Sequence, residues 1–216
     1  MSVDTDFIFS CKQLPKLKIA VELCEDLWTP NPPSIRHAMS GATVIVNLSA
    51  SDEVTGKAIY RRELVSGQSA RLICGYIYAS AGDGESTQDV VYSGHNLIAE
   101  NGLLLAESEL FDAQTISTEI DVSRLASERR RMTTFETVTE PTYRENVFSL
   151  QMEETELTRY IDPMPFFLKH IKDTTTPKAE GIMLFPQPGR GVVEGIQKNQ
   201  TFPLSDSGRP VEAWGV

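Results

Sequence analysis

The chain has 216 residues, 40% of them hydrophobic, and a formal net charge of −10. This length suits one domain or one and a half, and the composition is that of a soluble globular protein. The acidic balance argues against a nucleic-acid partner, because binding to phosphates requires clustered lysine and arginine. The basic run Arg129–Arg131 is too short to alter this, and we interpret it as a solvated helix end.

Membrane insertion and secretion are also not indicated. No apolar stretch approaches the ~20 residues that a membrane helix requires. The N-terminus is acidic and lacks the basic region of a secretory signal. The three cysteines, Cys11, Cys24 and Cys74, have no metal-like spacing. They predict free thiols in a reducing compartment, and therefore a cytoplasmic protein.

Strands and helices are expected to alternate in the first part of the chain. The predicted elements, in order, are a strand Leu17–Leu23, a short helix capped by Ser34 and ending near Met39, a strand Thr43–Leu48, a helix from Lys57 to about Cys74, and a strand Gly75–Ser80. The longer helix is expected to turn Ile59, Leu64, Val65 and Leu72 toward the core. This alternation predicts a parallel or mixed sheet with crossover helices.

Short strands are expected next. The candidates are Gln88–Ser93, His95–Ala99, Leu103–Glu107 and Thr115–Val122, followed by a polar helix at about Ser123–Arg131. Asn101-Gly102 predicts a hairpin, since both residues tolerate the positive φ of a type I′ turn. From about Phe167 onward, interspersed prolines and glycines remove any regular period, which predicts a poorly ordered or loosely docked tail.

Cys24 is the residue most suggestive of chemistry, because it ends the first predicted strand where the chain turns outward. A nucleophilic thiol must ionise, and the neighbouring Glu22, Glu25 and Asp26 oppose ionisation. A cation from elsewhere would be required. From the residue alone, an inert buried cysteine is the more frequent interpretation.

The surrounding residues favour a nucleophile. Val21–Ser34 (VELCEDLWTPNPPS) closely resembles the nucleophile segment of glutamine-dependent NAD(+) synthetases, whose N-terminal glutaminase domain belongs to the nitrilase superfamily of carbon-nitrogen hydrolases. The resemblance continues through the runs Asn47–Ser51, Gly56-Lys57, Arg61-Arg62, Gln68–Arg71, Tyr76–Gly82, Glu85–Thr87, Ser93–Gly102 and Leu105–Ser108. It is dense from about Asp6 to Asp112 and thins to Asp162–Phe166.

This resemblance implies roles for four residues. Cys24 would attack the side-chain amide of glutamine, form a thioester and release ammonia, and the backbone N–H of Glu25 would be an oxyanion donor. Ser51 and Lys57 fall where the family binds the α-amino and α-carboxylate groups of glutamine. Without the family, Ser51 would be interpreted as a loop residue and Lys57 as a solvated lysine of a first helical turn.

Other residues of the motif receive weaker interpretations. Trp28 is expected to pack, or to line the pocket. Glu85 and the Gly82–Gly84 turn are expected to brace the site. His37 and His95 are interpreted as surface or second-layer residues, and neither is expected to be the catalytic base.

Two other members of the family's Glu–Lys–Cys triad lie upstream of the cysteine in that family. Asp6–Phe9 already matches the segment just before the nucleophile strand, and Lys12, Lys16 and Lys18 are too close along the chain to substitute. We therefore expect that the chain is truncated, that it has negligible glutaminase activity alone, and that apolar faces of its sheet are exposed.

The family's second domain activates deamido-NAD with ATP through a glycine-rich phosphate loop, and no such run is found here. No cofactor is therefore expected in this chain; ATP, Mg and deamido-NAD are implied only for the synthetase domain. The expected partners are glutamine, and other copies or the remaining parts of the enzyme. Neither a nucleic acid nor a membrane is expected.

The fold class predicted is thus α/β, a partial nitrilase-type α-β-β-α sandwich. The predicted organisation is a partial carbon-nitrogen hydrolase domain at residues 1–135, an extension at 136–166 and an irregular tail at 167–216. Two alternatives remain open. The chain could be part of a nitrilase-type amidase completed by another polypeptide, or a non-catalytic module that binds a partner at an exposed sheet edge.

Overall fold

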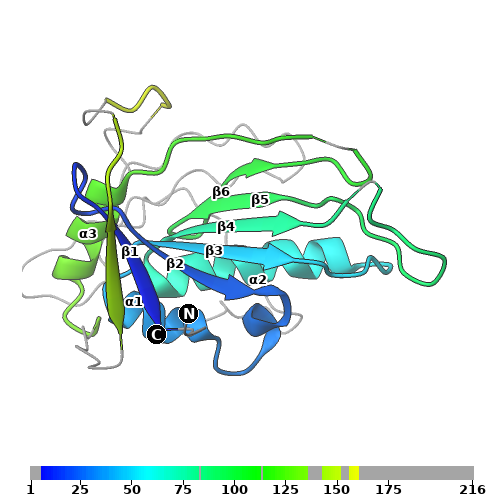
Figure 1. The fold of residues 1–216 in the computed structure, drawn as a ribbon, viewed down its shortest axis with the longest axis horizontal. Coiled ribbons are helices and arrows are strands. Elements are labelled where there is room, and N and C mark those ends of the chain that lie inside the picture. The colour runs from blue at the N-terminus through cyan, green and yellow to red at the C-terminus, as the bar shows by residue number, and fades with distance from the viewer. Residues whose placement is uncertain (1–5, 83, 113, 136–142, 152–155, 161–216) are drawn as a thin grey trace, which may run out of the picture. The chain divides into compact units, whose positions relative to one another are not determined.

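Seven strands form one mixed sheet in the order β6-β5-β4-β3-β2-β1-β7 (Figure 1). The computed structural model describes residues 6–82, 84–112, 114–135, 143–151 and 156–160. The strands are β1 (Phe7–Cys11), β2 (Lys18–Leu23), β3 (Val44–Ser49), β4 (Gly75–Ser80), β5 (Leu97–Glu100), β6 (Leu103–Glu107) and β7 (Arg144–Phe148). The helices are η1, a 3₁₀ helix (Cys24–Trp28), α1 (Pro33–Met39), α2 (Lys57–Leu72) and α3 (Val122–Arg131).

Strands β2, β3 and β4 run parallel at the centre of the sheet, with Leu23 beside Leu48 and Leu48 beside Ala79. Parallel neighbours require crossovers, and α1 and α2 supply them. The carboxyl ends of the three strands therefore meet at one edge. The predicted α/β class is confirmed.

Helices α1 and α2 cover the face of the sheet that forms the core, and α2 runs behind the strands in the view of Figure 1. The side chains that these strands turn toward the helices form one hydrophobic cluster. Its fully buried members include Ala20, Ile45, Tyr76 and Leu97, one from each of four strands. The inward face is apolar but carries hydroxyl groups, since Tyr76 and Tyr78 belong to the same cluster.

Apolar side chains on the opposite face are open to solvent. Phe9 and Val21 are each 37% exposed, Leu48 is 53% exposed and Leu23 is 58% exposed. Alternation along β2 and the register between β2 and β3 place Val21, Leu23 and Leu48 on the same face. The expected exposure of an apolar sheet face is thus observed.

The hairpin between β5 and β6 is confirmed. Asn101 and Gly102 have φ values of +46° and +86°, as a type I′ turn requires. A Cβ atom on Gly102 would lie 2.9 Å from Cβ of Ala70 on α2, so glycine is also required by the close approach of the helix.

Two predicted strands are wrong. Residues 88–93 do not join the sheet, because their backbone groups bond within the loop and to Glu53, whose N–H donates to the Val91 carbonyl. Residues 115–121 do not pair in the sheet either, although Ile120 packs over Gly75 on β4. The pattern of hydrophobic residues alone did not distinguish an extended segment that packs on the sheet from one that pairs with it.

Two predictions about the helices are also wrong. Ser34 does not cap α1, because Pro32 is the cap and Pro33, with its fixed φ, is the first helical residue. Ile59 is 60% exposed. The buried stripe of α2 passes through Arg61, Val65, Gln68 and Leu72, and Ile59 lies off it.

The described residues up to Arg159 belong to one compact unit. The domain boundaries proposed near residues 135 and 166 remain predictions. The tail predicted at 167–216 lies outside the described residues. Among the helices described, none combines the length and the apolar character needed to cross a membrane.

Candidate functional site

Cys24 lies on a sharp turn immediately after β2. Its φ of +43° is left-handed, a conformation that costs a residue with a side chain roughly 1 kcal/mol or more. The thiol is free and only partly buried. A strained, accessible cysteine at the carboxyl end of a central parallel strand is well placed to meet a small molecule.

Two side chains hold this turn. The Leu23 N–H donates to Oδ2 of Asp26 at 2.8 Å, which closes the turn across Cys24. Nδ2 of Asn47 on β3 donates to the Cys24 carbonyl at 3.3 Å. The turn therefore depends on polar contacts on both sides of the cysteine.

The sulfur itself contacts a hydroxyl group. Oγ of Ser49 donates to Sγ of Cys24 at 3.4 Å, and the Tyr78 hydroxyl donates to Oγ of Ser49 at 2.6 Å. Ser49 and Tyr78 are both buried and come from the neighbouring strands β3 and β4.

Glu22 points into the core beneath the turn and is only 2% exposed. Its carboxylate accepts a hydrogen bond from the Tyr76 hydroxyl and another, at 2.8 Å, from the Ser34 N–H. Burial, together with the adjacent Glu22 carboxylate, raises the pKa of Tyr76, so the phenol stays protonated as a donor. Asn47 Nδ2 reaches the same phenol oxygen at 3.3 Å, which links Glu22 to the carbonyl of Cys24.

The two residues assigned to glutamine recognition lie at this same edge of the sheet. Ser51 is buried in the loop that follows β3, and Lys57 begins α2. Nζ of Lys57 donates to Oδ1 of Asp52 at 2.7 Å and lies 5.6 Å from the ring centroid of Trp28. The hydrogen bond from Lys57 lowers the pKa of Asp52. Trp28 belongs to η1, so Lys57 packs on the helix that begins with Cys24.

Glu25 follows Cys24 in η1, and its side chain is exposed. The oxyanion role of its backbone N–H stays a prediction. Glu85 braces its own loop, since its carboxylate accepts from the Gly82 N–H at 2.9 Å.

Neither histidine of the described part contacts the sulfur. Both His37 and His95 are 1% exposed, which excludes a surface position for either. His37 bonds to the Tyr143 hydroxyl at 2.7 Å, and burial lowers the pKa of His37.

A buried charge cluster beside the site was not anticipated. Arg61 is fully buried on α2; its Nη1 lies 3.0 Å from Glu53 and 2.8 Å from Nδ1 of His95. Nε2 of His95 then bonds to Glu107 at 2.7 Å, and Glu107 pairs with Arg62. Burial opposes ionisation of Glu107, but the bonds from Arg62 and His95 outweigh it and lower the pKa of Glu107.

Within the described residues, no carboxylate, imidazole or amine makes a hydrogen bond to the Cys24 sulfur. The nearby lysines of the N-terminal segment bond elsewhere: Lys16 to Ser123 and Lys18 to Glu145. Neither of these lysines serves as a partner of the thiol here.

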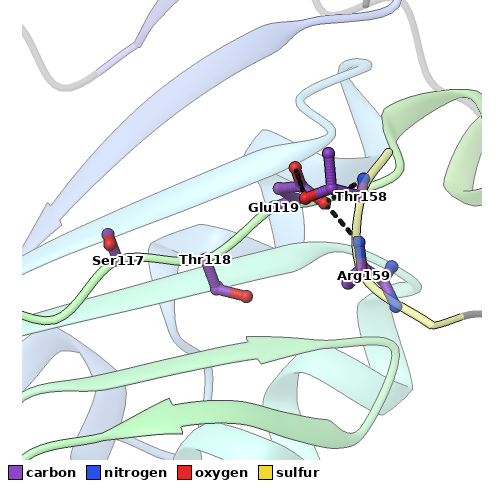
Figure 2. Close-up of a pocket in the computed structure, with 5 residues that line it drawn as sticks. All are labelled: Ser117, Thr118, Glu119, Thr158 and Arg159. Atoms are coloured by element: carbon purple, nitrogen blue, oxygen red, sulfur yellow. Dashed lines mark hydrogen bonds between the residues drawn. The ribbon is translucent and has the colours of Figure 1, made fainter. Parts of the chain in front are cut away.

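A separate hollow of about 360 Å³ is lined by Ser117, Thr118, Glu119, Thr158 and Arg159 (Figure 2). The Glu119 carboxylate fills part of it by accepting from the backbone N–H groups of Thr158 and Arg159 at 2.7 and 2.8 Å. Arg159 in turn forms an ion pair with Glu100 on β5. Glu100 lies opposite Gly75, the first residue of β4, and so at the amino ends of the parallel strands. The hollow is thus at the end of the sheet opposite to Cys24.

Fold and site together define a class: an α/β protein with an accessible cysteine on a strained turn at the carboxyl end of a parallel strand. No family model matches the sequence. Curated relatives do. The chain is 46% identical over 134 residues to the glutamine-dependent NAD(+) synthetase of Mycobacterium tuberculosis, which covers 61% of this chain and 20% of that protein. The human glutamine-dependent NAD(+) synthetase is 33% identical over 115 residues, covering 51% of this chain and 16% of that protein.

The resemblance to part of the glutamine-dependent NAD(+) synthetases is therefore confirmed, and the chain spans about a fifth of the length of these relatives. Similar solved structures include a glutamine-dependent NAD(+) synthetase from Cytophaga hutchinsonii, with 33% identity, a TM-score of 0.39 and coverage of 46% of this chain and 15% of that one. Nit3 of Saccharomyces cerevisiae, in the nitrilase superfamily, has 21% identity, a TM-score of 0.47 and coverage of 54% and 42%.

Proposed function

We propose that this chain carries the nucleophile-bearing part of a glutaminase and that Cys24 is the nucleophile. The observation that carries the proposal is the partly exposed thiol on its left-handed turn, in a segment similar to the NAD(+) synthetases. Glu22, Asn47 and Asp26 hold that turn through the contacts described above, as expected for a group that must meet a substrate in one orientation.

The reaction is acyl transfer. The Cys24 thiolate attacks the side-chain amide carbon of glutamine, and the C–N bond breaks as the nitrogen gains a proton and leaves as ammonia. Water then hydrolyses the γ-glutamyl thioester to glutamate and restores the thiol. The backbone N–H of Glu25, next after the nucleophile, would donate to the oxyanion.

Ser51 and Lys57 would hold the α-amino and α-carboxylate groups of glutamine. A lysine ammonium has three donors, so Lys57 can keep its bonds to Asp52 and still bind a carboxylate. The ammonium also lies against the ring of Trp28, which belongs to the helix η1 that begins with Cys24.

The ammonia would serve the ATP-dependent conversion of deamido-NAD to NAD in the cytoplasm, with ATP, Mg and deamido-NAD bound outside this chain. The triad glutamate and lysine would also come from polypeptide outside the described residues, either another copy or the remaining part of the enzyme.

Protection of the thiol by glutamine tests the proposal. Glutamine should slow the alkylation of Cys24 by iodoacetamide. Mass spectrometry of the peptide that contains Cys24 measures the rate. Lys57→Ala and Ser51→Ala should each abolish this protection. Lys16→Ala, which removes a lysine bonded to Ser123, should leave protection intact. Equal alkylation rates with and without glutamine would overturn the assignment of the binding residues.

Turnover is expected to be negligible in the chain alone, because no base contacts the sulfur within the described residues. A coupled assay should detect no more glutamate from this chain than from Cys24→Ala. Robust release that disappears in Cys24→Ala would show that the chain contains its own base.

A non-catalytic assembly module is the second candidate, and the exposed apolar face that includes Leu23 and Leu48 favours it. A nitrilase-type amidase with another substrate is the third. An unreactive Cys24 would support the module. A reactive Cys24 that glutamine does not protect would support the other amidase.

A further inference from the structure

We infer that the Tyr78 and Ser49 hydroxyl groups form a donor relay that orients the Cys24 sulfur and stabilises its thiolate. The inference deepens the proposed function, since it rests on Cys24 being the nucleophile. It concerns two residues, Ser49 on β3 and Tyr78 on β4, that lie in the resembling runs but received no role there and are not among the assigned glutamine contacts.

The direction of the hydrogen bonds supports the relay. Tyr78 donates to Oγ of Ser49 at 2.6 Å, and Ser49 donates its own hydrogen to Sγ at 3.4 Å, so both O–H groups point toward the sulfur. Donors in a chain polarise one another, and a hydrogen bond to an anion is stronger than one to a neutral group. The pair therefore stabilises the thiolate more than the thiol.

Burial strengthens this effect. Tyr78 is 1% exposed and Ser49 is 8% exposed, so water does not compete freely for either hydroxyl. The Arg61 guanidinium carbon lies 5.9 Å from the centroid of the Tyr78 ring. A cation at this distance from an aromatic face is attracted to it, which helps to hold the Tyr78 ring in place.

The surrounding charges make such a relay useful. The elements packed around Cys24 carry many charged or titratable groups. They include Glu22, Glu25 and Asp26 on β2 and η1, Tyr76 and Tyr78 on β4, and Lys57, Tyr60 and Arg61 on α2, while Lys18, Arg36, Arg62, Glu63 and Arg71 lie elsewhere on β2, α1 and α2. On α1, His37 bonds to Tyr143. The three carboxylates oppose a thiolate, while Lys57 and Arg61 pair with Asp52 and Glu53. The hydroxyl relay stabilises the anion without adding a charge.

The pH dependence of Cys24 alkylation tests the relay. Ser49→Ala should move the midpoint of the rate profile up by about one pH unit, which is about a tenfold loss of rate on the rising limb. Tyr78→Phe should move it in the same direction by less, although Tyr78 has no hydrogen bond to the sulfur. Ser49→Thr, which keeps the hydroxyl, should restore the original midpoint. None of these changes alters a formal charge.

Ser80→Ala is the matched control, because Ser80 on β4 has a buried hydroxyl for which the described part of the chain supplies no partner. Its midpoint should equal that of the natural chain. Midpoints of Tyr78→Phe and Ser49→Ala that match the natural chain would overturn the relay. If Ser49→Ala does not fold, as judged by circular dichroism, Tyr78→Phe decides alone.

Alkylation does not require glutamine, so the two proposals fail separately. A natural chain whose Cys24 never reacts between about pH 5 and pH 10 would overturn the nucleophile, and with it the relay. A reactive Cys24 that is insensitive to Tyr78→Phe would overturn only the relay.

Discussion

Glu22 is buried in the core beneath the turn at Cys24 and supports that turn. Its two oxygens accept from Tyr76 and from the Ser34 N–H, both of them buried. Through Tyr76 and Asn47, the same carboxylate is connected to the carbonyl of Cys24. A buried carboxylate with every partner in place is costly to remove, because each donor is then left without an acceptor.

Glu22→Ala should lower the free energy of unfolding by about 3 kcal/mol, since two buried donors lose their acceptor. Urea denaturation followed by circular dichroism measures this. Glu63→Ala removes an exposed carboxylate of α2 and should change stability by less than about 0.5 kcal/mol. A loss in Glu22→Ala no larger than that control would show that Glu22 does not support the turn.

His37 gives the fold a pH dependence. Burial lowers its pKa in the folded chain below the unfolded value, so the unfolded chain binds the proton more readily. Stability from neutral His37 is therefore fully present above about pH 6.5 and declines as the pH falls below that value. The difference in denaturation midpoint between pH 7 and pH 5.5 should shrink in His37→Gln. An undiminished difference would assign the dependence to other groups.

At the scale of single residues, the sequence was sufficient to single out Cys24, because the run of strand residues that precedes it is local. It did not single out Ser49, Tyr78 or Asn47. Their relation to Cys24 comes from the register of three strands, and a serine or a tyrosine in a buried strand carries no distinguishing local pattern.

At the scale of elements, the β5–β6 hairpin joins the edge of the sheet to α2. Gly102→Ala should destabilise the chain by about 2 kcal/mol, because φ at this position is +86° and the new Cβ would lie 2.9 Å from Ala70. Gly56→Ala is the control: φ there is +85°, but nothing lies within 4 Å of the new Cβ. Equal thermal midpoints for the two variants would contradict the contribution of the contact with Ala70.

Elements with strong local periodicity were predicted well, as β2, β3, α2 and β4 show. The pairing of β7 with β1 could not be predicted in this way, because Arg144–Phe148 is largely polar and its partner is more than a hundred residues away in the sequence. Residues 88–93 show the opposite error. They have the composition of a strand, but the loop itself and Glu53 satisfy their backbone groups.

At the scale of the whole described unit, the open apolar face is the main feature to explain. Leu23 and Leu48 lie side by side on it, and both are more than half exposed, at 58% and 53%. A face of this kind on a monomer marks a surface that is covered in an assembly, or one that promotes aggregation.

The double variant Leu23→Ser, Leu48→Ser should bind the dye ANS about twofold less than the natural chain, because it removes neighbouring apolar groups from this face. Ile59→Ser is the control, since Ile59 is 60% exposed but lies on α2. Fluorescence titration measures the difference. Equal dye binding in the double variant and the natural chain would indicate that the face is covered in solution.

In the function proposed here, Cys24 is presented to the side-chain amide carbon of glutamine. The most direct measurement is covalent capture by a glutamine analogue whose side-chain amide is replaced by a diazoketone, followed by mass spectrometry. We expect one adduct per chain on Cys24, lost in Cys24→Ala and suppressed by glutamine. An unlabelled Cys24 in a chain that iodoacetamide does modify, or equal labelling of Cys11 and Cys74, would contradict the role of Cys24 as the nucleophile.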